Sequence, residues 1–214
     1  MNKLFKILFV LFIVKPVILV VLGLNIRHRQ KLPLKGPAVL AANHNSHLDT
    51  MVLMSMFPIS KVHRVRPVAA ADYFLKNKYI AWFSLNCIGI IPLERSGTAE
   101  RETMFQACHE ALDNDEILII FPEGSRGDPD KISKIKKGLF HLVKDRPVTN
   151  IVPVVMHGLG KALPKNESVF VPFNCDVVVG DPIEITQDSN EFVHAIATTF
   201  DELLTQCLTR QEIE

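Results

Sequence analysis

The longest apolar stretch of the 214-residue chain lies at its start, in residues 4–24. Its length is about what a helix needs to cross the core of a bilayer, but Lys6 and Lys15 place charge in it. Pro16 removes a helical hydrogen-bond donor, so the pattern predicts two apolar runs that meet at a polar kink. We expect a membrane anchor, either a kinked spanning helix or a re-entrant hairpin with Lys15 at the interface. The alternatives are a buried core helix and a cleaved signal peptide, which the lack of a small-residue cleavage site disfavours.

From about residue 36, short apolar and β-branched runs alternate with stretches of helical periodicity. The runs predict strands at residues 38–43, 65–70, 87–92, 116–121, 151–155 and 175–179. The stretches predict helices at residues 50–57, 73–83, 98–114 and 189–208. Strands that are continuously apolar, as here, are typical of parallel sheets covered on both faces. The pattern therefore predicts an α/β fold with a central, mostly parallel sheet flanked by helices.

The charge of the chain is nearly balanced, with a formal net value of +1. A domain-wide positive field is therefore lacking, and we expect no nucleic-acid partner. Locally, the basic cluster Arg27, His28, Arg29 and Lys31 follows the apolar stretch at once, which favours the cytoplasmic side and anionic head groups. The four cysteines are scattered without a CxxC pair, which indicates reduced thiols in a domain that faces the cytoplasm.

The segment from Asn43 to Asp49 carries two residues that can act together in catalysis. His44 and Asp49 are five positions apart, so they would lie about 140° apart on one helix and on opposite sides of one strand. They meet only if the chain turns between them, and the pattern predicts this turn between a strand and a helix. Asp49 would then orient the His44 ring and leave one ring nitrogen to take a proton. The alternative is that Asp49 only caps its helix.

Two further clusters follow predicted strands. The first comprises Glu123, Gly124, Ser125 and Arg126, where the carboxylate can hold a hydroxyl or a cation and the glycine lets backbone approach a ligand. The second is Arg95, which precedes a predicted helix and would make a seat for a phosphate. The alternatives are a charged turn for the first and an ion pair with a neighbouring glutamate for the second. A third group, Lys134, Lys136 and Lys137, is typical of a solvated face.

Metal ligation and cysteine chemistry are less consistent with the sequence. His44, His47 and Asp49 are of metal-binding types, but their spacing matches no established pattern such as H-E-x-x-H, so we expect no metal site. No cysteine lies near the histidine cluster along the chain, which disfavours a cysteine nucleophile.

Four blocks of this sequence resemble, in order and in spacing, those of the PlsC-type glycerolipid acyltransferases, the family of the lysophosphatidic acid acyltransferases. They are Asn43-His44 with Asp49, Gly89 with Arg95, Phe121-Pro122-Glu123-Gly124-Ser125-Arg126, and Ile151-Val152-Pro153-Val154. Leu34-Lys35-Gly36-Pro37 and Gly180-Asp181-Pro182-Ile183 fit as well, so the resemblance covers roughly residues 33–185.

The resemblance implies an O-acyltransferase of phospholipid biosynthesis. Residues 1–31 would form the membrane anchor with its basic flank, and residues 32–214 the acyltransferase domain. His44 would be the general base and Asp49 its orienting partner. An acceptor hydroxyl would attack the thioester of acyl-CoA or acyl-carrier protein directly, with no acyl-enzyme, metal or cofactor. The expected partners are the membrane, its lipid acceptor and the thioester carrier.

The resemblance also implies how the acceptor is held. Arg95 would grip its phosphate, and Glu123, Gly124, Ser125 and Arg126 would shape its pocket. The expected reaction converts lysophosphatidic acid to phosphatidic acid.

The sequence departs from the family pattern after the second predicted strand. Many relatives carry a lysine there, in a segment like A-K-x-E-L-F, whereas this chain has Ala69-Ala70-Ala71-Asp72-Tyr73-Phe74. The cation that would assist Arg95 is missing, so another lysophospholipid or lipid acceptor is an alternative. A catalytically inactive membrane-binding module is a second alternative, and it predicts that His44 and Asp49 lie too far apart to touch.

Overall fold

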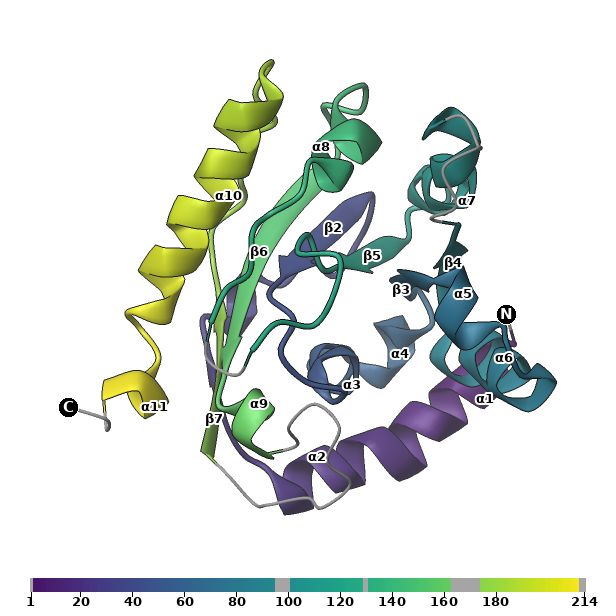
Figure 1. Cartoon of the computed structure of the whole chain (residues 1–214). Coiled ribbons are helices and arrows are strands. Elements are labelled where there is room, and N and C mark those ends of the chain that lie inside the picture. Colours follow the sequence, from purple (N-terminus) through teal and green to yellow (C-terminus); the bar gives the residue numbers. More distant parts are fainter. Residues whose placement is uncertain (1, 95–100, 129–130, 163–173, 212–214) are drawn as a thin grey trace.

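A computed structural model describes residues 2–94, 101–128, 131–162 and 174–211 (Figure 1). Within them the chain forms a seven-stranded sheet in the order β1-β7-β6-β2-β5-β3-β4. Neighbouring strands are parallel except for β6 and β7, so the predicted mostly parallel sheet is confirmed. The strands are β1 (Gly23–Arg27), β2 (Ala38–Ala42), β3 (Val65–Ala70), β4 (Ile91–Leu93), β5 (Ile117–Ile120), β6 (Asn150–His157) and β7 (Asn174–Val179).

Helices cover both faces of the sheet, as Figure 1 shows for α10 on one side and α1 to α4 on the other. The first face carries α1 (Lys3–Phe9), α2 (Lys15–Val21), α3 (Asp49–Ser55), α4 (Ile59–Val62), α5 (Ala71–Phe74) and α6 (Lys78–Phe83). The second carries α7 (Arg101–Asp113), α8 (Gly138–Val143) and α10 (Ser189–Leu204), and α9 (Leu159–Ala162) and α11 (Leu208–Gln211) complete the described helices.

Strand β2 shows why both faces are buried. Leu40 belongs to the core under the first group of helices, and its neighbours Val39 and Ala41 belong to the core under α7, α8 and α10. Successive side chains of a strand point to opposite faces, so a strand that is apolar at every position supplies both cores. The prediction of a sheet flanked by helices is confirmed.

Two predicted elements have different bounds in the structure. The helix expected over residues 73–83 is divided into α5 and α6, because the Asn77 side chain accepts the Tyr79 backbone N–H at 2.8 Å and caps a new helix there. The strand expected at residues 87–92 begins only at Ile91. A π-helical turn, Ser84–Ile88, precedes it and ends at Gly89, whose φ of 75° favours glycine.

The N-terminal apolar stretch is helical and lies along the first face of the domain. A π-helical segment, Val10–Val14, joins α1 to α2, and the Lys15 N–H donates to the Val10 carbonyl. This wider turn accommodates Pro16, which has no N–H and lies in the first turn of α2. Val10, Val14 and Ile18 are buried, so one stripe of the segment belongs to the core. Among the described residues, no helix combines the length and the apolar character needed to cross a membrane.

The residues that follow this segment join the main sheet. Strand β1 pairs in parallel with β7, although residues 23–27 fall in the part of the chain, residues 1–31, expected to be a membrane anchor with a basic flank. The basic side chains there have protein partners. Arg27 donates to the Gln206 carbonyl at 2.6 Å, Arg29 donates to the Met56 carbonyl at 2.6 Å, and Lys31 pairs with Asp181 at 2.8 Å.

Candidate active site

The turn after β2 and the loop after β5 leave the sheet side by side. Ala41 of β2 is in register with Ile120 of β5 in this parallel pair. His44 and Glu123 each follow three residues later and therefore emerge at the same edge, the carboxyl ends of the strands. Open α/β sheets bind ligands at such edges. The topology therefore brings the dyad turn and the loop after β5 together at one edge of the sheet.

His44 and Asp49 form a hydrogen-bonded pair. His44 Nδ1 lies 2.8 Å from Asp49 Oδ2, and the Asp49 side chain is 1% exposed whereas that of His44 is 21% exposed. Because a carboxylate accepts, Nδ1 carries the hydrogen, and Nε2 is the nitrogen that can take a proton. In the part of the chain that the structure describes, Nε2 has no hydrogen-bond partner. The alternative of a catalytically inactive module predicts that His44 and Asp49 lie too far apart to touch, and this prediction is wrong.

Backbone amides hold Asp49 in place. Its Oδ2 also accepts the N–H groups of Asn45 at 2.7 Å and Ser46 at 2.9 Å, so the tight turn that brings His44 back to α3 closes on this one oxygen. The turn is fixed at its start by Asn43. The buried Asn43 side chain donates to the Met156 carbonyl at 2.8 Å and accepts the Met156 N–H at 2.7 Å, which joins the end of β2 to β6.

Glu123 binds backbone on both sides. Its Oε1 accepts the His44 N–H at 2.7 Å and its Oε2 accepts the Ser133 N–H at 2.7 Å. The residue is 1% exposed, and this burial raises the pKa of the carboxyl, while hydrogen bonds from His44 and Ser133 act in the opposite direction. The arrangement makes Glu123 a brace between the dyad turn and the loop that follows β5.

The ring of His44 is also held from its face. It stacks on Phe121, with 4.0 Å between ring centroids and 18° between ring planes. The His44 carbonyl accepts the Gly127 N–H at 2.9 Å. The dyad and residues 121–127 therefore form one connected unit, although 77 to 83 residues of sequence separate them from His44.

The remaining predicted site residues have different settings. Gly124 has a φ of 74°, which favours glycine, and Ser125 is exposed. The Arg126 guanidinium contacts Nε2 of His47. Partial burial, with contributions from Arg126 and His44, lowers the pKa of His47, while Asp49 acts in the opposite direction, so the shift favours the neutral imidazole that can accept from Arg126. Arg95 lies outside the described residues.

Lys136 belongs to the lysine group that the sequence pattern assigns to a solvated face, and the structure places it beside the candidate site. A Cβ placed on Gly124 would lie 2.9 Å from Lys136 Nζ, so this ammonium group lies against the loop after β5. Among the described residues, no group of three or more His, Cys, Asp or Glu side chains is arranged to hold a metal ion.

Comparison with known proteins connects this edge of the sheet with one chemistry. The model of the family described as Acyltransferase matches residues 23–157, which include the dyad and the loop after β5. The chain is 28% identical over 162 residues to the chloroplastic 1-acyl-sn-glycerol-3-phosphate acyltransferase LPAT1 of Arabidopsis thaliana. The matched region covers 75% of this chain and 43% of that protein. The chain is 27% identical over 190 residues to 1-acyl-sn-glycerol-3-phosphate acyltransferase alpha of Homo sapiens, covering 85% and 65%.

The yeast Saccharomyces cerevisiae 1-acyl-sn-glycerol-3-phosphate acyltransferase is 30% identical over 139 residues, which are 64% of this chain and 44% of that protein. The chain thus spans less than two thirds of the length of these three relatives. Among solved structures, PlsC of Thermotoga maritima matches with a TM-score of 0.73 over 94% of this chain and 78% of that one. At 17% identity this match shows a shared fold.

Proposed function

The chain belongs to the acyltransferase family, and from this we propose that it transfers a fatty acyl group to the free hydroxyl of 1-acylglycerol 3-phosphate, which gives phosphatidic acid. The observation that carries the proposal is the contact between His44 Nδ1 and Asp49 Oδ2, because it leaves Nε2 of a partly exposed histidine available to take a proton. Three relatives bear the name of this activity, which supports the choice of acceptor. The donor is a thioester, acyl-CoA or acyl-carrier protein.

The reaction needs one base and no covalent enzyme intermediate. Nε2 of His44 takes the proton of the acceptor hydroxyl while the hydroxyl oxygen attacks the carbonyl carbon of the thioester. A C–O bond forms and the C–S bond breaks, and the proton passes from His44 to the departing thiolate. The Asp49 carboxylate stabilises the imidazolium in between and keeps the ring in the productive tautomer.

The experiment that tests this function is acyl transfer by the purified full chain with radiolabelled acyl-CoA and 1-acylglycerol 3-phosphate. The parent should form phosphatidic acid, and His44→Ala should lower kcat by about 10²–10⁴-fold, as expected for loss of a general base. His194→Ala is the matched control, because His194 is an exposed histidine of α10 that is absent from the dyad. Full activity of His44→Ala would overturn the mechanism.

A second acceptor is favoured by one observation. The segment from Ala69 to Phe74, at the end of β3 and in α5, holds no basic residue, so a head group other than a phosphate monoester is the alternative. Side-by-side kcat/KM values for 1-acylglycerol 3-phosphate and lysophosphatidylcholine decide between them. A clear preference for the choline ester would overturn the first choice.

We also propose that the chain lies on a membrane through one apolar surface. We call it the aromatic face; it comprises the exposed side chains of Leu4, Phe5, Leu8, Phe12, Tyr79, Ile80, Trp82 and Phe83. Phe5 packs on Trp82 with ring centroids 5.5 Å apart, so α1 and α6 present their apolar residues together. A contiguous exposed apolar patch is typical of a membrane or protein contact, and aromatic rings favour the head-group level.

Orientation toward the cytoplasm is part of the same proposal and rests on the basic residues 27–31. Three of these cations have protein partners, namely Arg27, Arg29 and Lys31. We therefore expect the aromatic face to contribute more to membrane attachment than the basic cluster does.

A further inference from the structure

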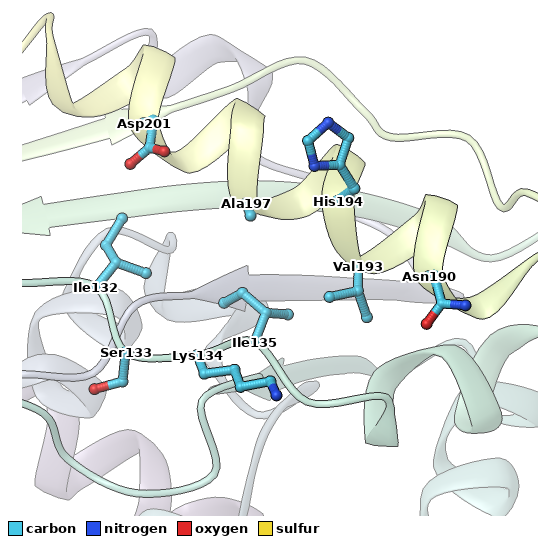
Figure 2. A pocket seen from close by; sticks show the side chains of 9 residues that line it. All are labelled: Ile132, Ser133, Lys134, Ile135, Asn190, Val193, His194, Ala197 and Asp201. Atoms are coloured by element: carbon cyan, nitrogen blue, oxygen red, sulfur yellow. The ribbon is translucent and has the colours of Figure 1, made fainter.

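The loop between β5 and α8 carries four lysines, and three of them, Lys134, Lys136 and Lys137, lie against different parts of the structure. Lys134 lines a groove of about 400 Å³ between this loop and α10, together with Ile135, Val193 and His194 (Figure 2). Lys137 lies near the start of α10. Backbone hydrogen bonds from Glu191 and Asn190 lower the pKa of Asp188 there, and the charge of Lys137 adds to this effect.

Lys136 turns instead toward the candidate active site. Its Nζ would lie 2.9 Å, and its Cδ 3.2 Å, from a Cβ on Gly124, so the side chain occupies the space that the missing Cβ leaves open. Backbone hydrogen bonds hold the loop at this position, and the Lys136 side chain itself is exposed. The Lys136 N–H donates to the Pro122 carbonyl at 2.9 Å, and the Ser133 N–H donates to Glu123 at 2.7 Å.

In the part of the chain that the structure describes, the charge of Lys136 is not paired with an acidic side chain, since no carboxylate there lies within salt-bridge distance of its ammonium group. Glu123, the acid next to Gly124, is buried and uses both oxygens for the backbone N–H groups of His44 and Ser133. The second cation of the loop, Arg126, contacts a histidine. Two cations, Arg126 and Lys136, thus lie in or against the segment 123–127 beside the dyad.

An unpaired ammonium group held near a catalytic base suits an anionic substrate group, and lysine binds phosphates as a point charge. We propose that Lys136 binds a phosphate ester of one of the two substrates and thereby supplies the cation that residues 69–74 lack. This inference rests on the proposed acyl transfer. Phosphate esters occur in both reactants, in the head group of the acceptor and in the carrier part of the donor.

Calorimetric titration of the full chain with two soluble probes tests the inference without turnover. The probes are sn-glycerol 3-phosphate for the acceptor head group and coenzyme A for the donor. Lys136→Ala should raise the Kd of one probe by about 10- to 100-fold, the range expected for the loss of a hydrogen bond from a charged group. Lys136→Arg should retain most of the affinity. Lys134→Ala is the control on the same loop, because that side chain faces α10, and it should leave both Kd values unchanged.

The probe that loses affinity identifies the source of the phosphate. Turnover then separates the same cases, since KM should rise for 1-acylglycerol 3-phosphate in one and for acyl-CoA in the other, with kcat changed less. Equal affinities of the parent and Lys136→Ala for both probes would overturn the inference, and so would a parent that binds neither probe. Probe binding that depends on Lys136 in a chain without acyl transfer would retain the anion site and reject the proposed function.

Discussion

At the scale of single residues, two buried carboxylates do different work. Asp49 accepts the His44 ring and two backbone N–H groups on one oxygen, whereas Glu123 accepts only backbone N–H groups. The first therefore acts on the reacting imidazole. The second holds the backbone that carries it.

Asp49→Asn tests the first role. An amide presents an NH₂ group where the ring N–H and two backbone N–H groups need an acceptor, so the His44 tautomer is no longer fixed. We expect kcat for acyl transfer to fall by about 10²–10⁴-fold. Asp181→Asn is the control, because Asp181 is an exposed residue that pairs with Lys31. Steady-state rates of the two variants give the comparison, and an Asp49→Asn enzyme as fast as the parent would contradict the role.

Glu123→Gln tests the second role. The glutamine retains one acceptor oxygen for two backbone donors, and its NH₂ group faces the other N–H. We expect the free energy of unfolding to fall by about 1–3 kcal/mol. Urea denaturation measures it, and Glu202→Gln, on the exposed side of α10, should have no such effect. An unchanged midpoint for Glu123→Gln would show that the brace is dispensable.

The sequence predicts that His44 and Asp49 can meet and that a polar cluster follows β5, and the structure confirms the contact between His44 and Asp49. His44 and Asp49 needed only a turn between a strand and a helix, and the apolar pattern marks both elements. The bracing by Glu123 was not predictable, since its partners are backbone N–H groups and these leave no trace in residue type. The position of Lys136 depends on a glycine twelve residues earlier in the chain, which only the folded loop brings near it.

At the scale of elements, continuous apolar runs predicted five of the strands closely, and they failed where a strand is half exposed. Strand β1 is mixed in polarity because it lies at the edge of the sheet, so its residues have intermediate burial and no clear period. The start of α7 lies next to residues 95–100, which the structure does not describe, so the predicted start of that helix at residue 98 is untested.

The helix α1 carries a buried lysine that should make stability depend on pH. Burial, with a contribution from Arg66, lowers the pKa of Lys6 from 10.5 to about 7, whereas Glu116 opposes the shift. Its Nζ donates to the Val65 carbonyl. Between these two pKa values the unfolded chain binds more protons than the folded one, so the contribution of Lys6 to stability rises with pH.

The measurement is urea denaturation of the parent and Lys6→Met across pH 7 to about pH 10. The free energy of unfolding of the parent should rise relative to that of Lys6→Met over this range. Lys3→Met is the control, because Lys3 is exposed on the same helix and should leave the pH dependence of the parent unchanged. If the free energy of unfolding depended on pH in the same way for the parent and Lys6→Met, the Lys6 ammonium group would be solvated in the folded chain.

At the scale of the whole molecule, the proposed membrane contact makes a prediction of its own. The aromatic face should set the affinity for bilayers, since each large apolar side chain contributes about 1.5–3 kcal/mol when it leaves water. The double substitution Phe12→Ser and Trp82→Ser, at positions 65% and 52% exposed, should weaken partitioning by at least about 100-fold.

Flotation with vesicles of phosphatidylglycerol and phosphatidylethanolamine measures this partitioning. Val148→Ser is the matched control, because Val148 is 80% exposed in the loop before β6 and lies outside the aromatic face. Calorimetric binding of sn-glycerol 3-phosphate should be the same in all three proteins. Vesicle binding by the double variant at the level of the parent would reject the aromatic face as the point of attachment.

The pairing of β1 with β7 has a consequence for the order in which the chain is made. Residues 23–27 can complete the sheet only after residues 174–178 have left the ribosome, about 150 residues of synthesis later. The helical segment before β1 therefore exists for most of translation before β7, the partner strand of β1, has been made, with Phe12 and its apolar neighbours already exposed. A growing chain in this state would meet a lipid surface first and close its sheet upon it afterwards.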